Sequence, residues 1–337
     1  MSAPVIPAPA VPGQVVGLAL QNPTSVALAG RLVSFGQEFA PGQVPKGAGL
    51  VAIINGQPTP VQMDVKTTNP DGSVAMAVLT LAQPAIAAGA SVPVMLALAA
   101  PASTPAKPVD ISALAAPGSH YNVQVTLALH NANGTTCPFA INAAAALVAA
   151  LKSGADSTWL SGPQATQVRV DVPVSGSLHV TLDITAFADG NTSTKVTFNN
   201  DIAMSAHGGA ATYDATITQN GAVAFKQSGI TQYQYTSWNT TVASNGAPAV
   251  NVQHDIAALE KTGLIQNYDL TAGVAPSLVA SEAAQMAKPG FGAVLGNAGV
   301  TQYMPMTGGR PDIGPTTEAN ALWLMTQNAT AAQYALA

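Results

Sequence analysis

Short stretches of alternating apolar and polar residues, separated by turn residues about every ten positions, dominate the first hundred residues of this 337-residue chain. Turn signals punctuate them, as in NPDGS at Asn69–Ser73, where Pro70 presets φ and Gly72 supplies a permissive position. This spacing predicts a small β-barrel or sandwich over residues 15–100. The expected strands lie at residues 14–22, 49–56, 59–69, 73–82 and 91–100.

A second region of alternating residues covers residues 119–245. It includes YDATITQNGAVAFKQ, which predicts a β-hairpin because Asn220-Gly221 suits a two-residue loop. One helix is expected to interrupt these strands at NAAAALVAALKSG, with Asn142 as N-cap and Gly154 as C-cap. The region therefore predicts a second, sandwich-like β domain with one inserted helix.

The period changes from about residue 252, where helical spacing replaces strand alternation. QHDIAALEKTGLI predicts a short helix with Asp255 in its first turn, and APSLVASEAAQMAK predicts another. The last helix is expected to start at Pro315 or Thr316 and to continue to the end of the sequence. The chain is thus expected to be mainly β and to end in a short α-helical segment over residues 246–337. Residues 1–14 are expected to form an extended Pro-rich arm, and residues 101–118 a linker.

Composition narrows the possible functions. Charged residues make up 8% of the chain, against about 25% in an average soluble domain. Aromatic residues make up only 5%, so the cores are thin and need long sheets or neighbouring subunits to hold their shape. A charge-poor surface of this kind is typical of proteins that are covered by neighbours in an assembly.

The distribution of charged and apolar residues argues against two partner classes. The eleven Lys and Arg are scattered and the net charge is −5, which disfavours nucleic acid as a partner. No apolar run of about 18 residues is free of breakers, which disfavours a membrane span. The N-terminus lacks the pattern of a signal peptide. Cys137 is the single cysteine, so neither an intrachain disulfide framework nor a cysteine zinc site is expected.

Catalytic motifs are sparse. No nucleophile elbow, P-loop, dinucleotide fingerprint or zinc-binding histidine pair occurs, so we expect no catalytic residue, no metal and no cofactor. The five histidines are interpreted as strand, turn or cap residues, although the glycine loop around His207 could place that residue near a ligand. The DGN at 189–191 with the NND at 199–201 could bind calcium, but turn chemistry explains both as well.

Two further groups of residues are candidates for binding. Arg310 and Asp312 lie in TGGRPDIGPTTEANALWLM, where Arg310 could hold an acidic sugar or a neighbour's carboxylate. The favoured alternative is that Arg310 pairs with Asp312 or a backbone carbonyl in a turn before the helix. Trp159, Tyr235 and Trp238 could stack on sugar rings, with a core or interface position as the favoured alternative.

The order and spacing of several short motifs resemble a known family. RLVSFGQEFAPGQVPKGAGL at residues 31–50 followed by PVQMDVKTTNPDGSVAMAVLTL at residues 60–81 is similar to the N-terminal RIFT-barrel domain of exo-rhamnogalacturonan-lyase-like proteins. Similar domains occur in bacteriophage tail and fibre proteins. The stretch at residues 213–238 and TGGRPDIGPTTEANALWLM also resemble those phage proteins.

The resemblance implies the fold more than the chemistry. Relatives typically carry Arg or Lys and His or Trp after the DGS motif, where this chain has Val74, Ala75 and Met76. Gln232 and Gln234 occupy polar positions of GITQYQYTSW, where relatives commonly have His and Arg. A lyase needs a general base and a cation for its enolate, and these residue types are missing from both stretches.

The sequence therefore predicts a non-enzymatic virion structural protein of a bacteriophage, from the tail, baseplate or fibre-attachment region. Its expected partners are other copies of itself, other virion proteins and host-surface polysaccharide, and its expected location is the phage particle after synthesis in the bacterial cytoplasm. The alternative is a polysaccharide lyase or glycosidase acting on acidic bacterial polysaccharide, which predicts that Arg310, Asp312 and His207 line one cleft.

Overall fold

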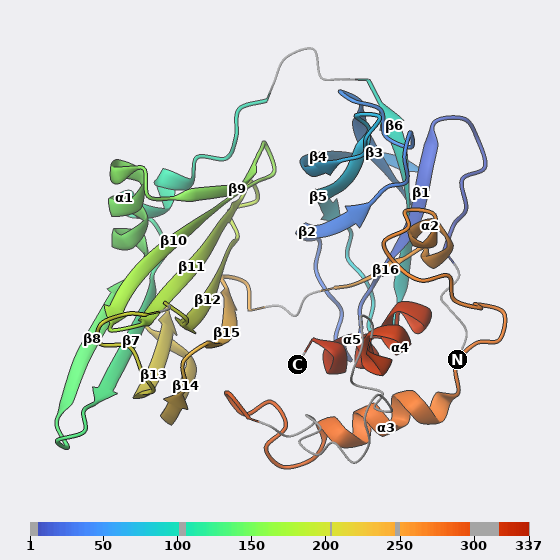
Figure 1. Cartoon of the computed structure of the whole chain (residues 1–337). Coiled ribbons are helices and arrows are strands. Elements are labelled where there is room, and N and C mark those ends of the chain that lie inside the picture. Colours follow the sequence, from blue (N-terminus) through green and yellow to red (C-terminus); the bar gives the residue numbers. More distant parts are fainter. Residues whose placement is uncertain (1–5, 101–105, 203, 247–249, 297–316, 337) are drawn as a thin grey trace. The chain divides into compact units, whose positions relative to one another are not determined.

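The computed structural model describes residues 6–100, 106–202, 204–246, 250–296 and 317–336 (Figure 1). The chain divides into two compact units. Unit 1 combines Met1–Pro105 with Pro248–Ala337, and unit 2 is Ala106–Ala247. Each unit is described by itself.

Unit 1 is built on one antiparallel sheet that curls into a nearly closed barrel, which confirms the predicted N-terminal barrel. In the described part of the chain the strand order is β16-β1-β6-β3-β4-β5-β2. The strands are β1 (Gln14–Gln21), β2 (Arg31–Glu38), β3 (Gly49–Ile54), β4 (Gln57–Thr68), β5 (Val74–Gln83), β6 (Ser91–Ala99) and β16 (Asn251–His254).

Alternation along these strands sends one set of side chains into the barrel. Leu18 and Leu20 of β1 and Leu79 and Leu81 of β5 are fully buried there, together with Phe39, which directly follows β2. Small residues share this core, so its few large side chains carry most of the apolar burial. The barrel is stable because nearly every inward position of its strands is apolar.

Side chains bridge the two ends of the sheet order. His254 of β16 contacts Gln37 of β2, with 3.1 Å between Nδ1 of the histidine and Oε1 of the glutamine. The ring of His254 also lies edge-on to Phe35 of β2, with 6.3 Å between the ring centroids. These contacts form a side-chain seam where the ladder of backbone hydrogen bonds ends.

The helical C-terminal segment is present, with two corrections. Residues 251–254 form strand β16 instead of entering a helix, and Asp255 is the N-cap of α2 (Ile256–Glu260), not a first-turn residue. The last helix is broken at Gln327, which has a φ of 51°, into two helices. The segment comprises α2, α3 (Pro276–Met286), α4 (Glu318–Thr326) and α5 (Ala329–Ala335).

Unit 2 contains two antiparallel sheets, as the sandwich-like prediction required. One sheet has the order β15-β12-β11-β10-β9, and the other has the order β14-β13-β7-β8. Helix α1 (Ala143–Ser153) is inserted between β8 and β9, and a 3-10 helix, η1 (Ile111–Ala115), precedes the strands. The strands are β7 (Val123–His130), β8 (Thr136–Asn142), β9 (Ser157–Ser161), β10 (Ala165–Ser175), β11 (Leu178–Phe187), β12 (Thr192–Asn200), β13 (Ala211–Gln219), β14 (Ala222–Gln232) and β15 (Thr236–Ala243).

Local signals in unit 2 produce the predicted local structures. Asn220 and Gly221 both have positive φ, 52° and 81°, and close the β13–β14 hairpin. Asn142 accepts the N–H of Ala145 at the start of α1, and Gly154 ends the helix in the left-handed conformation. These turns and caps fix the strands that carry the candidate site.

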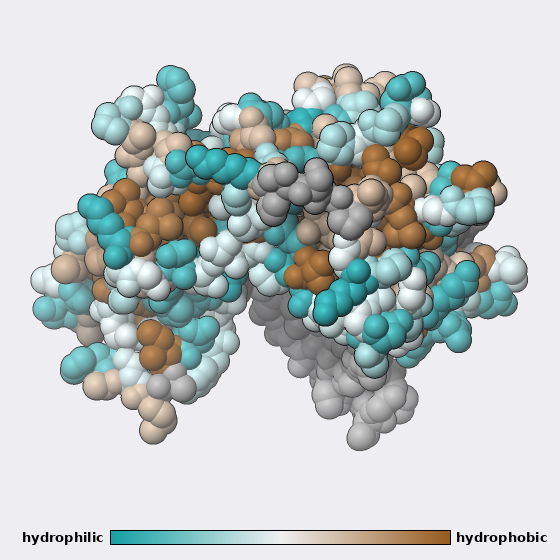
Figure 2. All heavy atoms as spheres, turned by 90° about the horizontal axis from the view of Figure 1, so that it is seen from above, coloured by the Kyte–Doolittle hydropathy of each residue, from teal (hydrophilic) through white to brown (hydrophobic). Residues whose placement is uncertain are grey.

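The surface reflects the low charge of the sequence. Figure 2 shows apolar residues exposed between polar ones across the visible face of the molecule. None of the helices described here is both long enough and apolar enough to cross a lipid bilayer.

Candidate functional site

The sequence-predicted binding residues have different positions in the structure. Arg310 and Asp312 lie outside the described residues, so the predicted cleft with His207 has no structural description. Trp238 is buried in unit 2, with 7% of its surface exposed. His207 and Tyr235 are exposed and lie in two neighbouring loops at one end of unit 2.

Trp238 is a core residue. Its ring stacks on Phe198 with 4.1 Å between centroids and 6° between planes. Its Nε1 donates a hydrogen bond to the hydroxyl of Tyr213 at 2.8 Å. Since both the ring face and the indole N–H are occupied inside the sandwich, Trp238 does not offer a stacking surface to a ligand.

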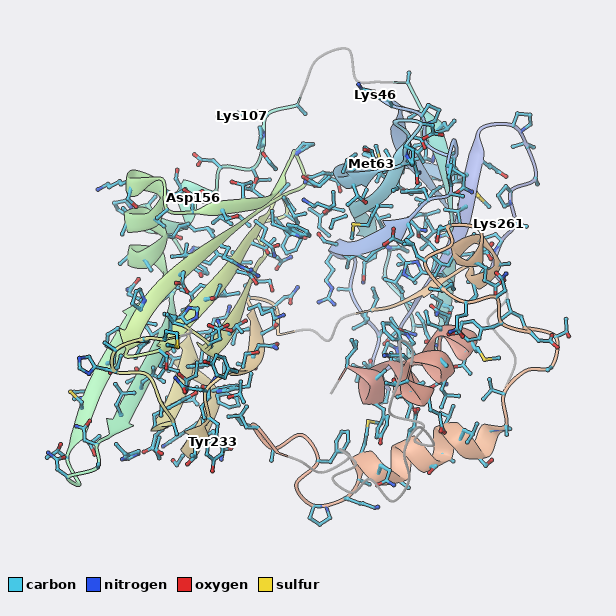
Figure 3. All side chains as sticks on the ribbon, viewed as in Figure 1. Lys46, Met63, Lys107, Asp156, Tyr233 and Lys261 are labelled. Atoms are coloured by element: carbon cyan, nitrogen blue, oxygen red, sulfur yellow. The ribbon has the colours of Figure 1, made fainter. Side chains whose placement is uncertain are left out.

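The exposed aromatics of this end lie in the turn between β14 and β15. Tyr233 and Tyr235 are 67% and 66% exposed, and Figure 3 shows Tyr233 at the opposite end of unit 2 from Asp156. Tyr235 has a φ of 64°, a conformation that bulky residues rarely adopt. Its N–H donates to the carbonyl of Asn200 at 2.7 Å, which holds this strained backbone in place. Strain of this kind concentrates at ligand-contacting positions.

Two fully buried side-chain amides, those of Gln232 and Asn200, hold the backbone of this turn in place. Gln232 donates from Nε2 to the carbonyls of Phe198 and Thr236, and its Oε1 accepts the Tyr213 hydroxyl. Asn200 donates from Nδ2 to the carbonyls of Gln232 and Gly209. A network in which each amide bridges different segments fixes the backbone of the turn that carries the tyrosines, which lowers the entropy cost of binding.

The second loop follows β12 and approaches the turn at Gly208, where an added Cβ would lie 2.7 Å from Nε2 of Gln234. Met204 is 93% exposed with a φ of 60°, and Ile202 and His207 are also exposed. The loop lies against the β10–β11 turn, where a Cβ added at Gly176 would come within 2.2 Å of the His207 carbonyl oxygen. Only glycine fits at position 176, so this approach is built into the sequence.

A charged cluster borders this loop. His179 of β11 contacts Asp171 of β10 through Nδ1 at 2.5 Å and Asp201 through Nε2 at 2.7 Å. Asp171 also accepts from Thr181, which accepts in turn from Asn199. Partial burial lowers the pKa of His179, but hydrogen bonds to the two carboxylates and their charges outweigh it, so the net shift is upward.

The strand register brings Asp171 near His179, because Asp171 stands opposite Thr181, two residues along β11 from His179. His179 stands directly opposite Asn199, which stands opposite Ser237, so the three side chains form one cross-strand row. Further along the same face of the sheet, Arg169 stands opposite Asp183. Its Nε and Nη2 donate to the two carboxylate oxygens of Asp183 at 2.7 Å and 2.9 Å. Because side chains alternate between faces, this side of the sheet is polar and hydrogen-bonded while the other side forms the core.

We define the end face as Ile202, Met204, His207, Tyr233 and Tyr235, and the His179 cluster as His179, Asp171 and Asp201. Exposed aromatic rings suit the apolar faces of sugars. Carboxylate oxygens can accept hydrogen bonds from sugar hydroxyl groups. In the His179 cluster both ring nitrogens face carboxylates. No group of His, Cys, Asp or Glu side chains among the described residues has the arrangement of a metal site. Asp189, considered for calcium, instead accepts the N–H of Asn191 within a turn.

Comparisons with known proteins give little further information. No family model matches the chain, and no curated protein matches it. Among solved structures, the chain is similar to a glycosyl hydrolase family 38 protein from Enterococcus faecalis, with 8% identity and a TM-score of 0.32. The match covers 61% of this chain and 33% of that one, so the chain spans about a third of that protein's length. A likeness this weak carries no argument about function.

Sequence reasoning missed several residues of this site. Tyr233 and Met204 are more exposed than Trp238, and the spacing of two tyrosines in QYQYTSW was the available signal. His179 was interpreted as a strand residue, which it is, and the alternation of β11 places it on the polar face. Its partnership with Asp201 depends on the path of the chain after β12.

Proposed function

We propose that this chain is a non-enzymatic structural protein of a bacteriophage particle, from the tail, baseplate or fibre-attachment region, which contacts host-surface glycan through the end face. The observation that carries the glycan contact is the pair of exposed tyrosines, Tyr233 and Tyr235, in a turn whose backbone is held by buried amides. The exposure of aromatic rings to water is energetically unfavourable, and a pair of exposed rings is typical of a binding surface.

The edges of the four-stranded sheet support assembly with neighbouring subunits. The outer edges of β8 and β14 have no strand partner in the described part of the chain. β8 contains no charged residue, and β14 contains only Lys226, while its Val223 side chain is exposed. Isolated proteins commonly protect such edges with charges, so these edges are suited to contact further copies of the chain or other particle proteins.

The first experiment tests the glycan contact directly. Full-length protein is passed over immobilised capsular and lipopolysaccharide glycans from candidate host bacteria, alongside the variant Y233A/Y235G. Glycine at position 235 keeps the left-handed backbone while removing the ring. We expect binding by the unchanged chain and a loss of about tenfold or more in the variant, the scale of removing a contact worth about 1.4 kcal/mol.

A matched control separates the end face from general surface effects. Trp159, the remaining stacking candidate from the sequence, is 49% exposed and not a core residue. It lies in β9, which pairs with the first residues of β10, and so lies away from the end face. Trp159→Ala should leave glycan binding unchanged. Equal losses in both variants would overturn the end-face assignment, and release of unsaturated sugar ends would favour the lyase alternative instead.

The assembly part has its own readout. Light scattering of the purified chain should give a discrete oligomer, and mass spectrometry of purified particles should detect the chain as a virion component. A concentrated, stable monomer that is missing from the particles would argue strongly against the structural role.

A further inference from the structure

The geometry around His179 requires a particular protonation state. Both ring nitrogens lie at hydrogen-bond distance from carboxylate oxygens, 2.5 Å to Asp171 and 2.7 Å to Asp201. A carboxylate can only accept, so each nitrogen must donate, and only the imidazolium form has two N–H groups. A neutral imidazole would place one nitrogen lone pair against one of the carboxylates.

His179 links two different parts of unit 2. Asp171 lies on β10 beside it, whereas Asp201 is the first residue after β12 and begins the loop that carries Ile202, Met204 and His207. The far end of this loop is fixed separately, because buried Asn200 donates to the Gly209 carbonyl at 2.8 Å. In the described part of the loop, the contact of Asp201 with His179 ties down the first half.

We propose that His179 is a pH-sensitive latch, which holds the described part of the loop between β12 and β13 in the end face while protonated and releases it when it loses its proton. This inference rests on the proposed glycan contact, because it assigns a means of regulation to the same surface. A released loop would no longer hold Met204 and Ile202 in fixed positions in the end face, so binding weakens without any change in the ligand.

The charged groups around His179 determine whether the latch is closed at low or at high pH. Asp171 faces it from β10 and Asp201 from the loop, while its direct neighbour on β12 is the neutral Asn199. Both charged neighbours favour the imidazolium, which agrees with a pKa above the ordinary 6.5. The latch is therefore fully formed at a pH below the ordinary histidine pKa of 6.5, and it is lost as the pH rises through the raised pKa of His179.

The first test does not depend on any glycan. Amide hydrogen exchange of residues 204–209 is followed between pH 6 and pH 9 in the full chain, in Asp201→Asn and in His179→Gln. We expect both variants to exchange about tenfold faster at pH 6, the scale of a lost charge-assisted hydrogen bond. Asp201→Asn removes only an exposed carboxylate charge, so it keeps the test open if His179→Gln folds poorly.

The matched control is His130→Gln. His130 contacts one carboxylate, that of Asp214, at 3.2 Å on the other sheet. This variant should exchange like the unchanged chain at every pH, which also removes the intrinsic pH dependence of exchange from the comparison. Equal exchange in Asp201→Asn and His130→Gln, with an unchanged pH profile, would overturn the latch.

The second test measures glycan binding across the same pH range with the same variants. Binding that falls as the pH rises in the unchanged chain, and is weak at every pH in Asp201→Asn, supports the latch and the glycan contact together. Faster loop exchange without glycan binding at any pH would remove the proposed function and leave the latch as a loop device. Binding that is independent of pH in every variant would reject the latch and keep the function.

Discussion

The side-chain oxygen Oε1 of Gln327 accepts the backbone N–H of His254 at a distance of 2.9 Å. Gln327 lies between α4 and α5 in a left-handed conformation and is 2% exposed. Its own carbonyl accepts from the side chains of Asn251 and Gln253. One glutamine thereby takes the place of a paired strand along β16, and the helical segment covers an edge that would otherwise be open.

Gln327→Ala should therefore lower the free energy of unfolding of unit 1 by about 1–3 kcal/mol, since the N–H of His254 loses its partner in a buried position. Urea denaturation measures the change. Gln333→Ala, on the exposed face of α5, is the control and should have little effect. Similar midpoints for the two variants would contradict the role given to Gln327.

Tyr213→Phe should destabilise unit 2 by about 1–3 kcal/mol, because it leaves two buried groups without a partner. Those groups are Nε1 of Trp238 and Oε1 of Gln232, both of which bond the missing hydroxyl. Burial raises the pKa of Tyr213, so the hydroxyl stays protonated at neutral pH. Thermal unfolding gives the loss. An unchanged transition would show that the network adds nothing to stability.

Glu282 predicts a pH dependence in the helical segment. Burial and the nearby charge of Glu318 raise the pKa of Glu282 to about 7, and its Oε2 has no hydrogen-bond partner. The folded state therefore holds a proton that the unfolded state releases, and stability falls as the pH rises from about 4.5 to about 7. Glu282→Gln should remove this slope and stabilise the protein at pH 8 by about 1–2 kcal/mol. Urea midpoints at pH 5 and pH 8 test it, and an equal slope in both proteins would refute it.

His254 should have the opposite dependence. Burial lowers its pKa to about 4, so the folded state holds it neutral. Stability is complete above the ordinary value of 6.5 and decreases as the pH falls toward 4, where protonation would place a charge in the barrel seam. His254→Asn should lose this acid sensitivity, as fluorescence-monitored unfolding at pH 4 and pH 7 can show. Retained sensitivity would point to another group.

Much of this fold follows from local patterns. Alternation located β1, β3, β4, β5 and β6 of the barrel but missed β2 (Arg31–Glu38). Asn220, Gly221, Asn142 and Gly154 formed the expected turn and caps because each needs only its neighbours. The residues that complete the structure depend on distant partners. β16 is only four residues long and exists because it pairs with β1, as Asn251 opposite Gln21 illustrates.

The candidate site was harder to predict for the same reason. An aromatic residue is exposed or buried according to tertiary packing, so the sequence grouped the exposed Tyr235 and the buried Trp238 as equal candidates for stacking. His179 acquires its two carboxylates from β10 and from the start of a loop, 8 and 22 residues away. The residue types were visible in the sequence, but their meeting point was set by strand register and loop path.

The division of the chain has a consequence for its synthesis. Unit 2 is continuous in sequence, whereas unit 1 is assembled from residues on both sides of it. On the ribosome, β1 emerges before unit 2, whereas its partner β16 and the capping Gln327 follow only after all of unit 2. Since domains generally fold as units during translation, unit 2 can complete its sandwich while the barrel still has an open side. The nascent barrel would thus expose the edge of β1 for the time needed to translate the whole inserted unit.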